Sequence, residues 1–235
     1  MTVDFDFEGT VALVTGASGT LGGAVARAFH DAGASVAAAD VVEPDDEDGF
    51  FDSDRVRFYE GDFADEDEVT RVVDAVASDF GRIDHLANIA GTWRGGSPID
   101  ETDAETFDFL FDVNLKTMFL TSKHALPHLR ETAGTIVSVS ARSSLEGGEG
   151  DGIYRASKAG VRLLTETIAE ENLGVVRANA VMPSIIDTPM NREMMPNADF
   201  ETWVTPAEIA QTILFLCSDA SSATSGAAVP VYGEA

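Results

Sequence analysis

Cysteine and lysine are both scarce in this 235-residue chain, which holds one cysteine, Cys217, and only three lysines. A single cysteine excludes an internal disulfide and a cysteine metal cluster. No apolar run approaches the roughly 20 residues needed to span a bilayer, and the acidic start of the chain is unlike a secretory signal, which is basic and then apolar. We therefore expect a soluble, cytoplasmic protein.

Positive charge is scarce as a whole, because 15 Lys and Arg stand against 41 Asp and Glu, for a formal net charge of -26. Each phosphate contact needs a cation, so nucleic acid and anionic membranes are poor partners. The carboxylates recur along the whole chain, and such a surface repels itself until concentrated salt screens it. We infer adaptation to a highly saline cytoplasm, with an ordinary acidic protein as the alternative.

Apolar strand-like runs alternate with segments of helical periodicity. The apolar residues of 21–32 and 69–80 follow the i, i+3, i+4 rule of helices, and further helices are expected over 103–130, 154–172 and 205–217. This order predicts a single-domain α/β protein with a Rossmann-type, doubly wound, seven-stranded parallel sheet flanked by helices. The expected strands are Thr10–Val14, Ser35–Asp40, Arg55–Tyr59, Ile83–Asn88, Thr135–Ser140, Val175–Val181 and Ala228–Val231.

Two stretches lack this regularity: the acidic segment 43–54 and a longer segment over about 183–205. A long irregular segment inside a compact domain usually serves function. We expect the second, called the lid segment below, to cover the substrate.

The first predicted strand leads into a glycine-rich turn, Thr15–Gly23, and then into a helix. Glycines permit a tight turn and close backbone approach, and a helix N-terminus offers free N–H groups to a pyrophosphate. A plain turn is the alternative, which the flanking strand and helix disfavour. The predicted cofactor contacts here are Gly16, Ser18, Gly19, Thr20, Leu21 and Gly22.

Asp40 ends the second predicted strand, about 20 residues beyond these glycines. A carboxylate there can bind both hydroxyls of an adenosine ribose and repels a 2′-phosphate. Neither Arg nor Lys lies in the glycine-rich turn or beside Asp40. The sequence therefore predicts NAD(H) in preference to NADP(H), with a solvated strand-end Asp as the alternative.

Tyr154 and Lys158 are four residues apart and so share one face of a predicted helix. A free tyrosine has a pKa near 10, which makes it a poor acid–base group at neutral pH. An ammonium group within about 5 Å favours the phenolate and lowers that pKa. The pair predicts an acid–base site, and an amphipathic tyrosine on a surface helix is the alternative.

These features occur in an order that resembles the short-chain dehydrogenase/reductase family, from about Thr10 to Gly233. The resemblance implies hydride transfer between a nicotinamide and the carbonyl carbon of a small molecule. Tyr154 would be the general acid–base, Lys158 would also hold the nicotinamide ribose, and Asn114 would hold a relay water. The resemblance further implies a homotetramer or homodimer built on the 103–130 and 154–172 helices.

The remaining family markers are assigned to cofactor binding by the same resemblance. Asp62 would meet the adenine, and Ile186 and Thr188 would position the carboxamide. The full set of these markers is Asp62, Phe63, Asn88, Ala90, Gly91, Pro183, Ile186 and Thr188.

The family's catalytic serine usually lies thirteen residues before the tyrosine, and that position holds Ala141. Ser140 is one residue off, and Ser143 and Ser144 follow in the same turn. We choose Ser140 as the hydroxyl that polarises the substrate carbonyl. A site with no such serine would favour substrates that need little polarisation.

A narrower resemblance is to quinonoid dihydropteridine reductases, carried by residues 90–93, 145–148 and especially 187–203. Those enzymes resemble this chain in lacking the usual serine, and they reduce an electrophilic pterin ring with NADH. Trp93 could stack on a planar substrate or simply pack in its loop. A 3-oxoacyl thioester reductase, a sugar or polyol dehydrogenase, and a dinucleotide-binding regulator without turnover stay open.

A metal site is not expected from this sequence. His124 and His128 have the spacing of a metal-binding pair on a helix, but Pro127 lies between them and no third ligand is indicated. Both are interpreted as residues of a solvated helix face.

The charge pattern predicts that salt stabilises the fold. We expect the thermal midpoint to rise from dilute buffer to molar KCl, because counterions screen the repulsion among 41 carboxylates. Melting curves in the two buffers measure the effect, and a neutral osmolyte at matched osmolality controls for solute exclusion. A midpoint that does not rise with KCl removes the halophilic interpretation.

Overall fold

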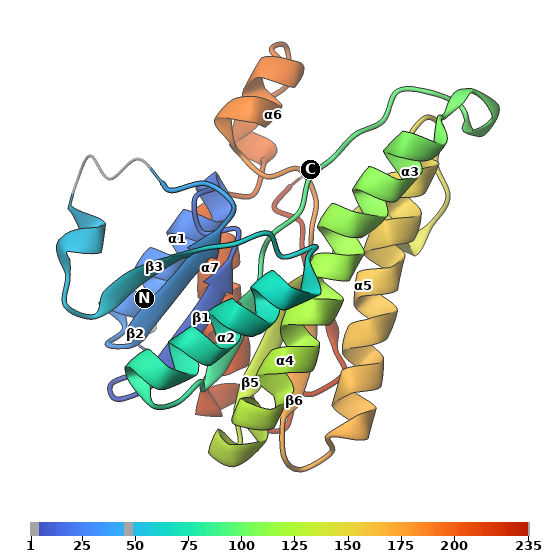
Figure 1. Cartoon of the computed structure of the whole chain (residues 1–235). Coiled ribbons are helices and arrows are strands. Elements are labelled where there is room, and N and C mark those ends of the chain that lie inside the picture. Colours follow the sequence, from blue (N-terminus) through green and yellow to red (C-terminus); the bar gives the residue numbers. More distant parts are fainter. Residues whose placement is uncertain (1–4, 45–48, 235) are drawn as a thin grey trace.

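The computed structural model describes residues 5–44 and 49–234. It shows one seven-stranded parallel sheet between two layers of helices (Figure 1). The strands are β1 Val11–Thr15, β2 Ser35–Asp40, β3 Val56–Glu60, β4 His85–Asn88, β5 Thr135–Val139, β6 Arg177–Pro183 and β7 Ala228–Val231. Their spatial order is β3-β2-β1-β4-β5-β6-β7. The predicted doubly wound fold is confirmed, and its switch point lies between β1 and β4, where such sheets bind ligands.

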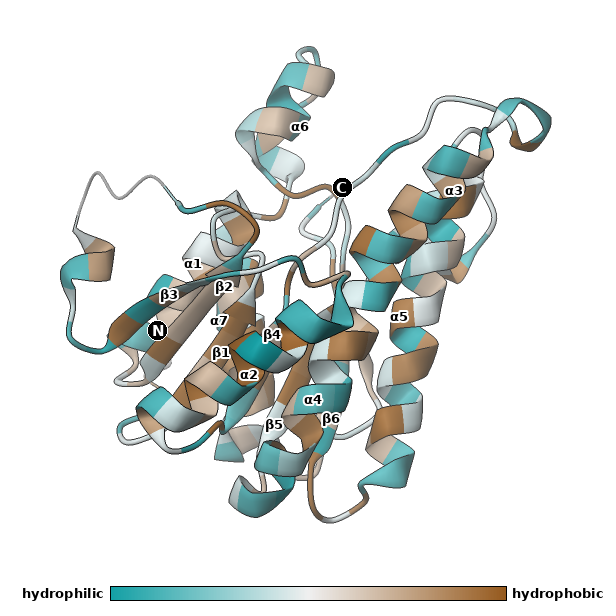
Figure 2. Ribbon diagram, in the orientation of Figure 1, coloured by the Kyte–Doolittle hydropathy of each residue, from teal (hydrophilic) through white to brown (hydrophobic). Residues whose placement is uncertain are grey.

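Helices cover both faces of this sheet, and their outer sides carry hydrophilic residues (Figure 2) together with exposed apolar ones such as Phe107, Phe119 and Leu163. Helices α1 and α7 pack together over one face, and α2, α4 and α5 cover the other. The helix bounds are α1 Thr20–Asp31, α2 Glu66–Phe80, α3 Ala104–Phe111, α4 Thr117–Thr132, α5 Gly152–Glu171, α6 Pro189–Met194 and α7 Pro206–Cys217. In the described ranges no helix is long and apolar enough to cross a membrane.

Strand β1 shows why its sequence is a continuous apolar run. Ala12 and Val14 join the core under α1 and α7, whereas Val11 and Leu13 join the core under α2 and α4. Because successive side chains of a strand point to opposite faces, a strand covered on both sides buries all of them and reads as an apolar run.

The segment predicted as one helix over 103–130 is divided in the structure. Helix α3 ends at Phe111, a π-helical turn spans Asp112–Lys116, and α4 follows from Thr117. A π turn contains one residue more than an α turn, and such turns are frequent at functional sites. This turn contains Asn114, which is almost fully buried.

The lid segment is more ordered than its sequence indicates. Thr188 caps α6 by accepting a hydrogen bond from the backbone N–H of Asn191 at 3.2 Å. The base of the segment closes where Asp187 N donates to Val204 O at 2.8 Å and Ile186 bridges Val204 in parallel. Figure 1 shows α6 standing beyond the end of the sheet, near the C-terminus.

The acidic segment 43–54 is described only in part, because residues 45–48 lie outside the described ranges. Its later part forms a short 3₁₀ turn at Phe50–Asp52, with Phe50 buried.

A buried histidine starts β4. The ring of His85 packs against Phe7 and Phe29, with centroids 5.0 and 5.8 Å away, and its Nδ1 lies 2.8 Å from Thr135 Oγ1. Burial lowers the pKa of this imidazole from 6.5 to about 4. The folded state therefore holds His85 neutral at pH values where the unfolded chain binds a proton.

This histidine predicts that acid destabilises the fold before the carboxylates titrate. Neutral His85 contributes up to about 3 kcal/mol to the free energy of unfolding. This contribution is complete above pH 6.5 and is lost as pH falls toward 4. We expect His85→Gln to flatten the slope of unfolding free energy against pH between about 6.5 and 5, measured by denaturant titration. His128→Gln, on α4 outside the core, is the control, and equal slopes in the wild type and His85→Gln contradict the prediction.

Candidate active site

Two glycines let the turn after β1 pack tightly against the turn after β4. Gly16 has a φ of 70°, and a Cβ on it would lie 2.8 Å from the backbone of Ala90. A Cβ on Gly22 would lie 1.9 Å from the carbonyl oxygen of Gly16. Only glycine fits at either position, so the two turns and the start of α1 can pack this closely together.

Helix α1 begins at this turn with its first N–H groups available. Its N-cap residue, Gly19, makes no side-chain capping bond. The amides of Thr20, Leu21 and Gly22 therefore open the helix at the switch point of the sheet, where the helix dipole favours an anion. The predicted pyrophosphate contacts are brought together in this turn.

Asp40 ties the end of β2 to the same turn. One carboxylate oxygen accepts from Ser18 N at 2.9 Å and the other from Val41 N at 2.7 Å. Ser18 Oγ in turn donates to the carbonyl oxygen of Val42 at 2.5 Å. An ionised carboxylate has about four acceptor positions, so Asp40 can accept two more hydrogen bonds from a ribose.

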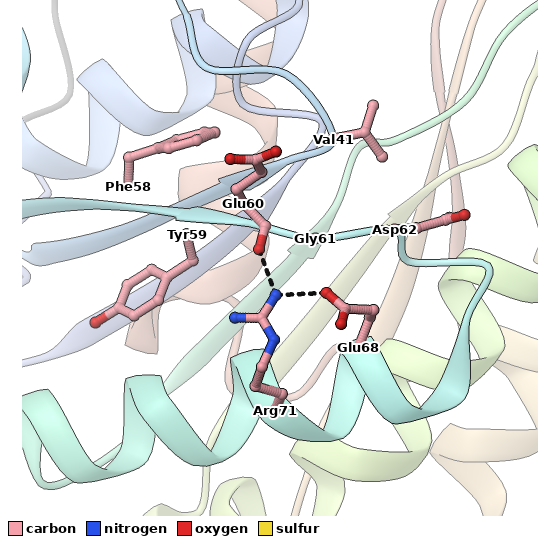
Figure 3. Close-up of a pocket in the computed structure, with 8 residues that line it drawn as sticks. All are labelled: Val41, Phe58, Tyr59, Glu60, Gly61, Asp62, Glu68 and Arg71. Atoms are coloured by element: carbon pink, nitrogen blue, oxygen red, sulfur yellow. Dashed lines mark hydrogen bonds and ion pairs between the residues drawn. The ribbon is translucent and has the colours of Figure 1, made fainter.

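An open hollow of about 680 Å³ lies beside Asp40, and Figure 3 shows its lining. It contains a cation that the sequence analysis missed. Arg71, which lies on α2, donates to the carbonyl oxygen of Glu60 at 2.7 Å and to the carboxylate of Glu68 at 2.5 Å. No pattern near Asp40 in the sequence indicates Arg71, because α2 folds back along β3 to bring it there.

Asp62 and Phe63 follow β3 as predicted. Asp62 lines the hollow with Val41 (Figure 3), and its carboxylate accepts from the backbone N–H of Ala64 at 2.9 Å. Phe63 is buried in the core under α2. The structure thus brings Asp62, but not the Phe63 side chain, to the surface where an adenosine would lie.

Asn88, the last residue of β4, connects this strand to α4 and to β5. Its Nδ2 donates to Ser122 Oγ at 3.0 Å and to Ser138 Oγ at 3.3 Å. Its buried Oδ1 has no hydrogen-bond partner among the described residues. Asn88 therefore fixes the end of β4 from inside the core, while the backbone of Ala90 packs against Gly16.

Lys158 and Asn114 both lie against Gly91. Lys158 is 4% exposed, and its Nζ donates to the carbonyl oxygen of Val139 at 2.9 Å. A Cβ on Gly91 would lie 2.8 Å from that Nζ and 2.9 Å from Asn114 Oδ1. Any larger residue at position 91 would push the lysine and the asparagine out of place.

The side-chain amide of Asn114 uses both its oxygen and its nitrogen to hold the loop after β4 against α5. Its Oδ1 accepts from Thr92 N at 2.8 Å and its Nδ2 donates to Ser157 Oγ at 3.1 Å. Ser157 Oγ donates to the carbonyl oxygen of Tyr154 at 2.8 Å. A chain of hydrogen bonds therefore connects the π turn to the residue that carries the phenol.

The pKa values of Tyr154 and Lys158 reflect burial of both groups. Burial lowers the pKa of Lys158 to about 8. Burial, with a smaller effect of the Asp151 charge, raises the pKa of Tyr154 to about 12. The expected lowering of the tyrosine pKa by Lys158 is therefore wrong for the protein alone, where desolvation of the phenol and the Asp151 charge both raise it.

Ser140 lies in the core of the site with its hydroxyl already engaged. Its Oγ donates to the carbonyl oxygen of Lys158 at 2.8 Å and lies 3.2 Å from Ser144 Oγ. Ser140, Ala141 and Ser144 are all buried, whereas Ser143 is half-buried. This geometry gives Ser140 a structural task, and it leaves Ser143 as the more accessible hydroxyl of the turn.

Pro183, Ile186 and Thr188 all follow the carboxyl end of β6. Pro183 is the last residue of the strand, the Ile186 carbonyl oxygen accepts from Asn191 Nδ2 at 2.8 Å, and Thr188 caps α6. The three residues therefore lie at the same edge of the sheet as the glycine-rich turn.

Trp93 and the lid methionines form exposed apolar surface above this edge. Trp93 is 43% exposed and lies over Gly95, where a Cβ would approach its ring to 2.8 Å. Met190 and Met194 are also exposed, whereas Trp203 is buried against Phe200.

A metal-binding cluster of three or more His, Cys, Asp or Glu is not found within the described part of the chain. His124, one of the pair considered above, lies 3.1 Å from a carboxylate oxygen of Glu66 through its Nε2.

Known proteins similar to this chain have the same fold and related activities. The family model described as enoyl-(acyl carrier protein) reductase matches residues 16–233. A 3-oxoacyl-(acyl-carrier-protein) reductase of Thermotoga maritima is 35% identical, covering 96% of this chain and 97% of that protein. A meso-2,3-butanediol dehydrogenase of Serratia marcescens is 33% identical, covering 97% and 95%.

Solved structures agree with these relatives. A protein from Brucella melitensis, titled short-chain dehydrogenase/reductase and glucose/ribitol dehydrogenase, superposes with a TM-score of 0.90 at 31% identity over 98% of both chains. Levodione reductase gives a TM-score of 0.90 at 29% identity over 97% of both chains. With the glycine-rich turn and the Tyr154–Lys158 pair in place, the chain belongs to the short-chain dehydrogenase/reductase family of nicotinamide dinucleotide-dependent oxidoreductases.

Proposed function

We propose that this protein is an NAD(H)-dependent oxidoreductase that interconverts a small carbonyl compound and its alcohol, with Tyr154 as the general acid–base. The observation that carries the proposal is that Lys158 Nζ lies against Gly91 and close to Asn114. Lys158 is one helical turn from Tyr154 on α5. These groups lie at the carboxyl edge of the sheet, beside the glycine-rich turn.

The residues present fit a nicotinamide dinucleotide. Gly16 and Gly22 let the turn pack tightly against the start of α1, whose uncapped N-terminus would bind a pyrophosphate, and Asp40 has acceptor capacity left for a ribose. The cofactor, when bound, supplies or accepts the hydride at its nicotinamide ring. Lys158, through an ammonium proton not given to Val139, would hold the second ribose.

Tyr154 would move the proton that balances the hydride. In reduction its hydroxyl protonates the developing alkoxide, and in oxidation its phenolate takes the proton of the alcohol. The raised pKa of Tyr154 keeps the phenol protonated at neutral pH in the free protein, which suits the reductive direction. Lys158 lies on the same helix face and stabilises the phenolate formed after proton transfer.

The substrate would be one that needs little help in polarising its carbonyl. Ala141 has no hydroxyl, and the Ser140 hydroxyl is engaged with Lys158 O. A conjugated, electrophilic ring such as a quinonoid dihydropterin meets this condition, and the exposed Trp93 is available to stack on it. Where a hydroxyl donor is needed, Ser143 is the better placed serine.

Reduction of a 3-oxoacyl thioester is the second candidate. It is favoured by the similarity over almost the whole chain to a 3-oxoacyl-(acyl-carrier-protein) reductase. A substrate panel of acetoacetyl thioester, quinonoid dihydropterin, an aldohexose and meso-2,3-butanediol, each with NADH or NAD+ in molar KCl, compares the two. A regulator without turnover would bind NADH and convert none of them.

The general acid–base role predicts a severe loss of turnover in Tyr154→Phe. We expect kcat on the best panel substrate to fall by about 10²–10⁴, the usual contribution of general acid–base catalysis, with the dissociation constant of NADH unchanged. Tyr59→Phe is the matched control, because it keeps the ring that lines the hollow and removes only a hydroxyl that donates to Asp79 of α2 at 2.8 Å. An active Tyr154→Phe protein overturns the assignment.

The position of Asp40 predicts selectivity for NADH over NADPH. We expect Asp40→Asn to reduce the ratio of NADPH to NADH dissociation constants by about tenfold, because the repulsion of a 2′-phosphate is worth on the order of 1 kcal/mol near a surface. Fluorescence titration measures both constants. Asp31→Asn removes a charge at the opposite end of α1 and should leave the ratio unchanged, whereas a wild-type preference for NADPH refutes the proposal.

A further inference from the structure

Arg155, the residue after Tyr154, makes more contacts than a surface helix arginine needs. Its Nε donates to Asp151 Oδ1 at 2.6 Å. Its Nη1 lies 3.3–3.4 Å from three backbone carbonyl oxygens, those of Ser143, Glu146 and Gly147. One guanidinium group therefore connects the first turn of α5 to the chain that follows β5.

Gly148 gives an independent sign that this arrangement is specific. A Cβ on Gly148 would lie 2.2–2.3 Å from three atoms of the Arg155 guanidinium. Any side chain at position 148 would displace the arginine, because the guanidinium is packed directly against the glycine backbone. The pair is also shielded from water, since the side chains of Arg155 and Asp151 are only 21% and 17% exposed.

The segment 143–148, called the tether loop below, borders the site on one side. It connects the turn of Ser140 and Ala141 to the first turn of α5, which carries Tyr154. Just beyond it, the carbonyl oxygen of Gly150 accepts from Gly96 N at 2.7 Å, which attaches it to the loop that holds Trp93. A guanidinium that fixes the tether loop therefore also fixes two sides of the substrate space.

We propose that Arg155 is a positioning residue for the reaction proposed above: it holds the tether loop against α5 and balances the charge of Asp151 beside Tyr154. The proposal rests on the proposed function for its kinetic consequences, whereas the tether itself does not. A planar fork that donates to several carbonyls at once is a task for arginine and not for lysine.

The charge of Asp151 matters because it acts on the phenol. The Asp151 carboxylate raises the pKa of Tyr154, and Arg155 pairs with that carboxylate. Loss of the arginine would leave the negative charge unbalanced and raise the tyrosine pKa further. The other charged groups around this turn are Lys158 on α5, Glu146 and Arg142 on the chain after β5, and Arg94, Glu101 and Asp103, which line a hollow of about 220 Å³ with Asp151.

Four variants separate the two parts of this role. Arg155→Met removes both the tether and the charge, and Arg155→Lys keeps the charge but loses the fork. The double variant Asp151→Asn with Arg155→Met removes both charges. Arg162→Met is the matched control, because Arg162 bonds Glu166 at 2.6 Å with the same i,i+4 spacing farther along α5.

Kinetics on the best panel substrate read both parts. For Arg155→Met we expect kcat/KM to fall about tenfold or more, because misplaced site walls cost catalysis, and the kinetic pKa of the tyrosine to rise by about one unit. For Arg155→Lys we expect a raised KM with the wild-type pH profile. The double variant should regain the wild-type pH profile and keep the raised KM, and Arg162→Met should match the wild type in both.

Amide hydrogen exchange tests the tether whether or not a substrate is found. We expect residues 143–150 to exchange at least tenfold faster in Arg155→Met than in the wild type or Arg162→Met, because the loop loses its anchoring donor. Unchanged exchange overturns the tether, and unchanged pH profiles overturn the charge balance. Faster exchange in a protein that binds NADH but converts no panel substrate keeps the tether and refutes the proposed function instead.

Discussion

The site depends on one interaction, the hydrogen bond from the buried ammonium group of Lys158 to the carbonyl oxygen of Val139. An isolated charge in the interior is costly, and here the Val139 carbonyl oxygen offsets that cost at 2.9 Å. The bond is possible only because β5 ends beside α5 at the carboxyl edge of the sheet. It fixes the helix face that carries Tyr154, and it requires Gly91 to have no side chain.

The π turn solves a packing problem around this lysine. A continuous α-helix through residues 103–130 would present Asn114 at a different angle, since each π turn adds one residue. With the turn, Asn114 reaches both Thr92 N and Ser157 Oγ. The loop after β4 and the helix α5 are then held at one fixed spacing.

Burial gives the two functional side chains opposite pKa shifts, as general electrostatics requires. Desolvation disfavours the charged form of each, so the tyrosine pKa rises to about 12 and the lysine pKa falls to about 8. The phenol of the free protein therefore stays protonated at neutral pH and is a weaker acid than a free tyrosine. The Asp151–Arg155 pair, in the same helix turn, sets the local charge that the phenol experiences.

The sequence by itself determined the fold class, the positions of the strands along the chain, the glycine-rich turn and the spacing of Asp40, Tyr154 and Lys158, because each depends on local periodicity or short spacing. Strand ends were predicted to within two residues: β6, for example, spans Arg177–Pro183 where Val175–Val181 was expected. Only the tertiary structure decided that Arg71 lies at the hollow lined by Val41 and Asp62, that the Ser140 hydroxyl is engaged with Lys158 O, and that the tyrosine pKa rises. These facts depend on burial and on contacts between distant segments, which no local pattern encodes.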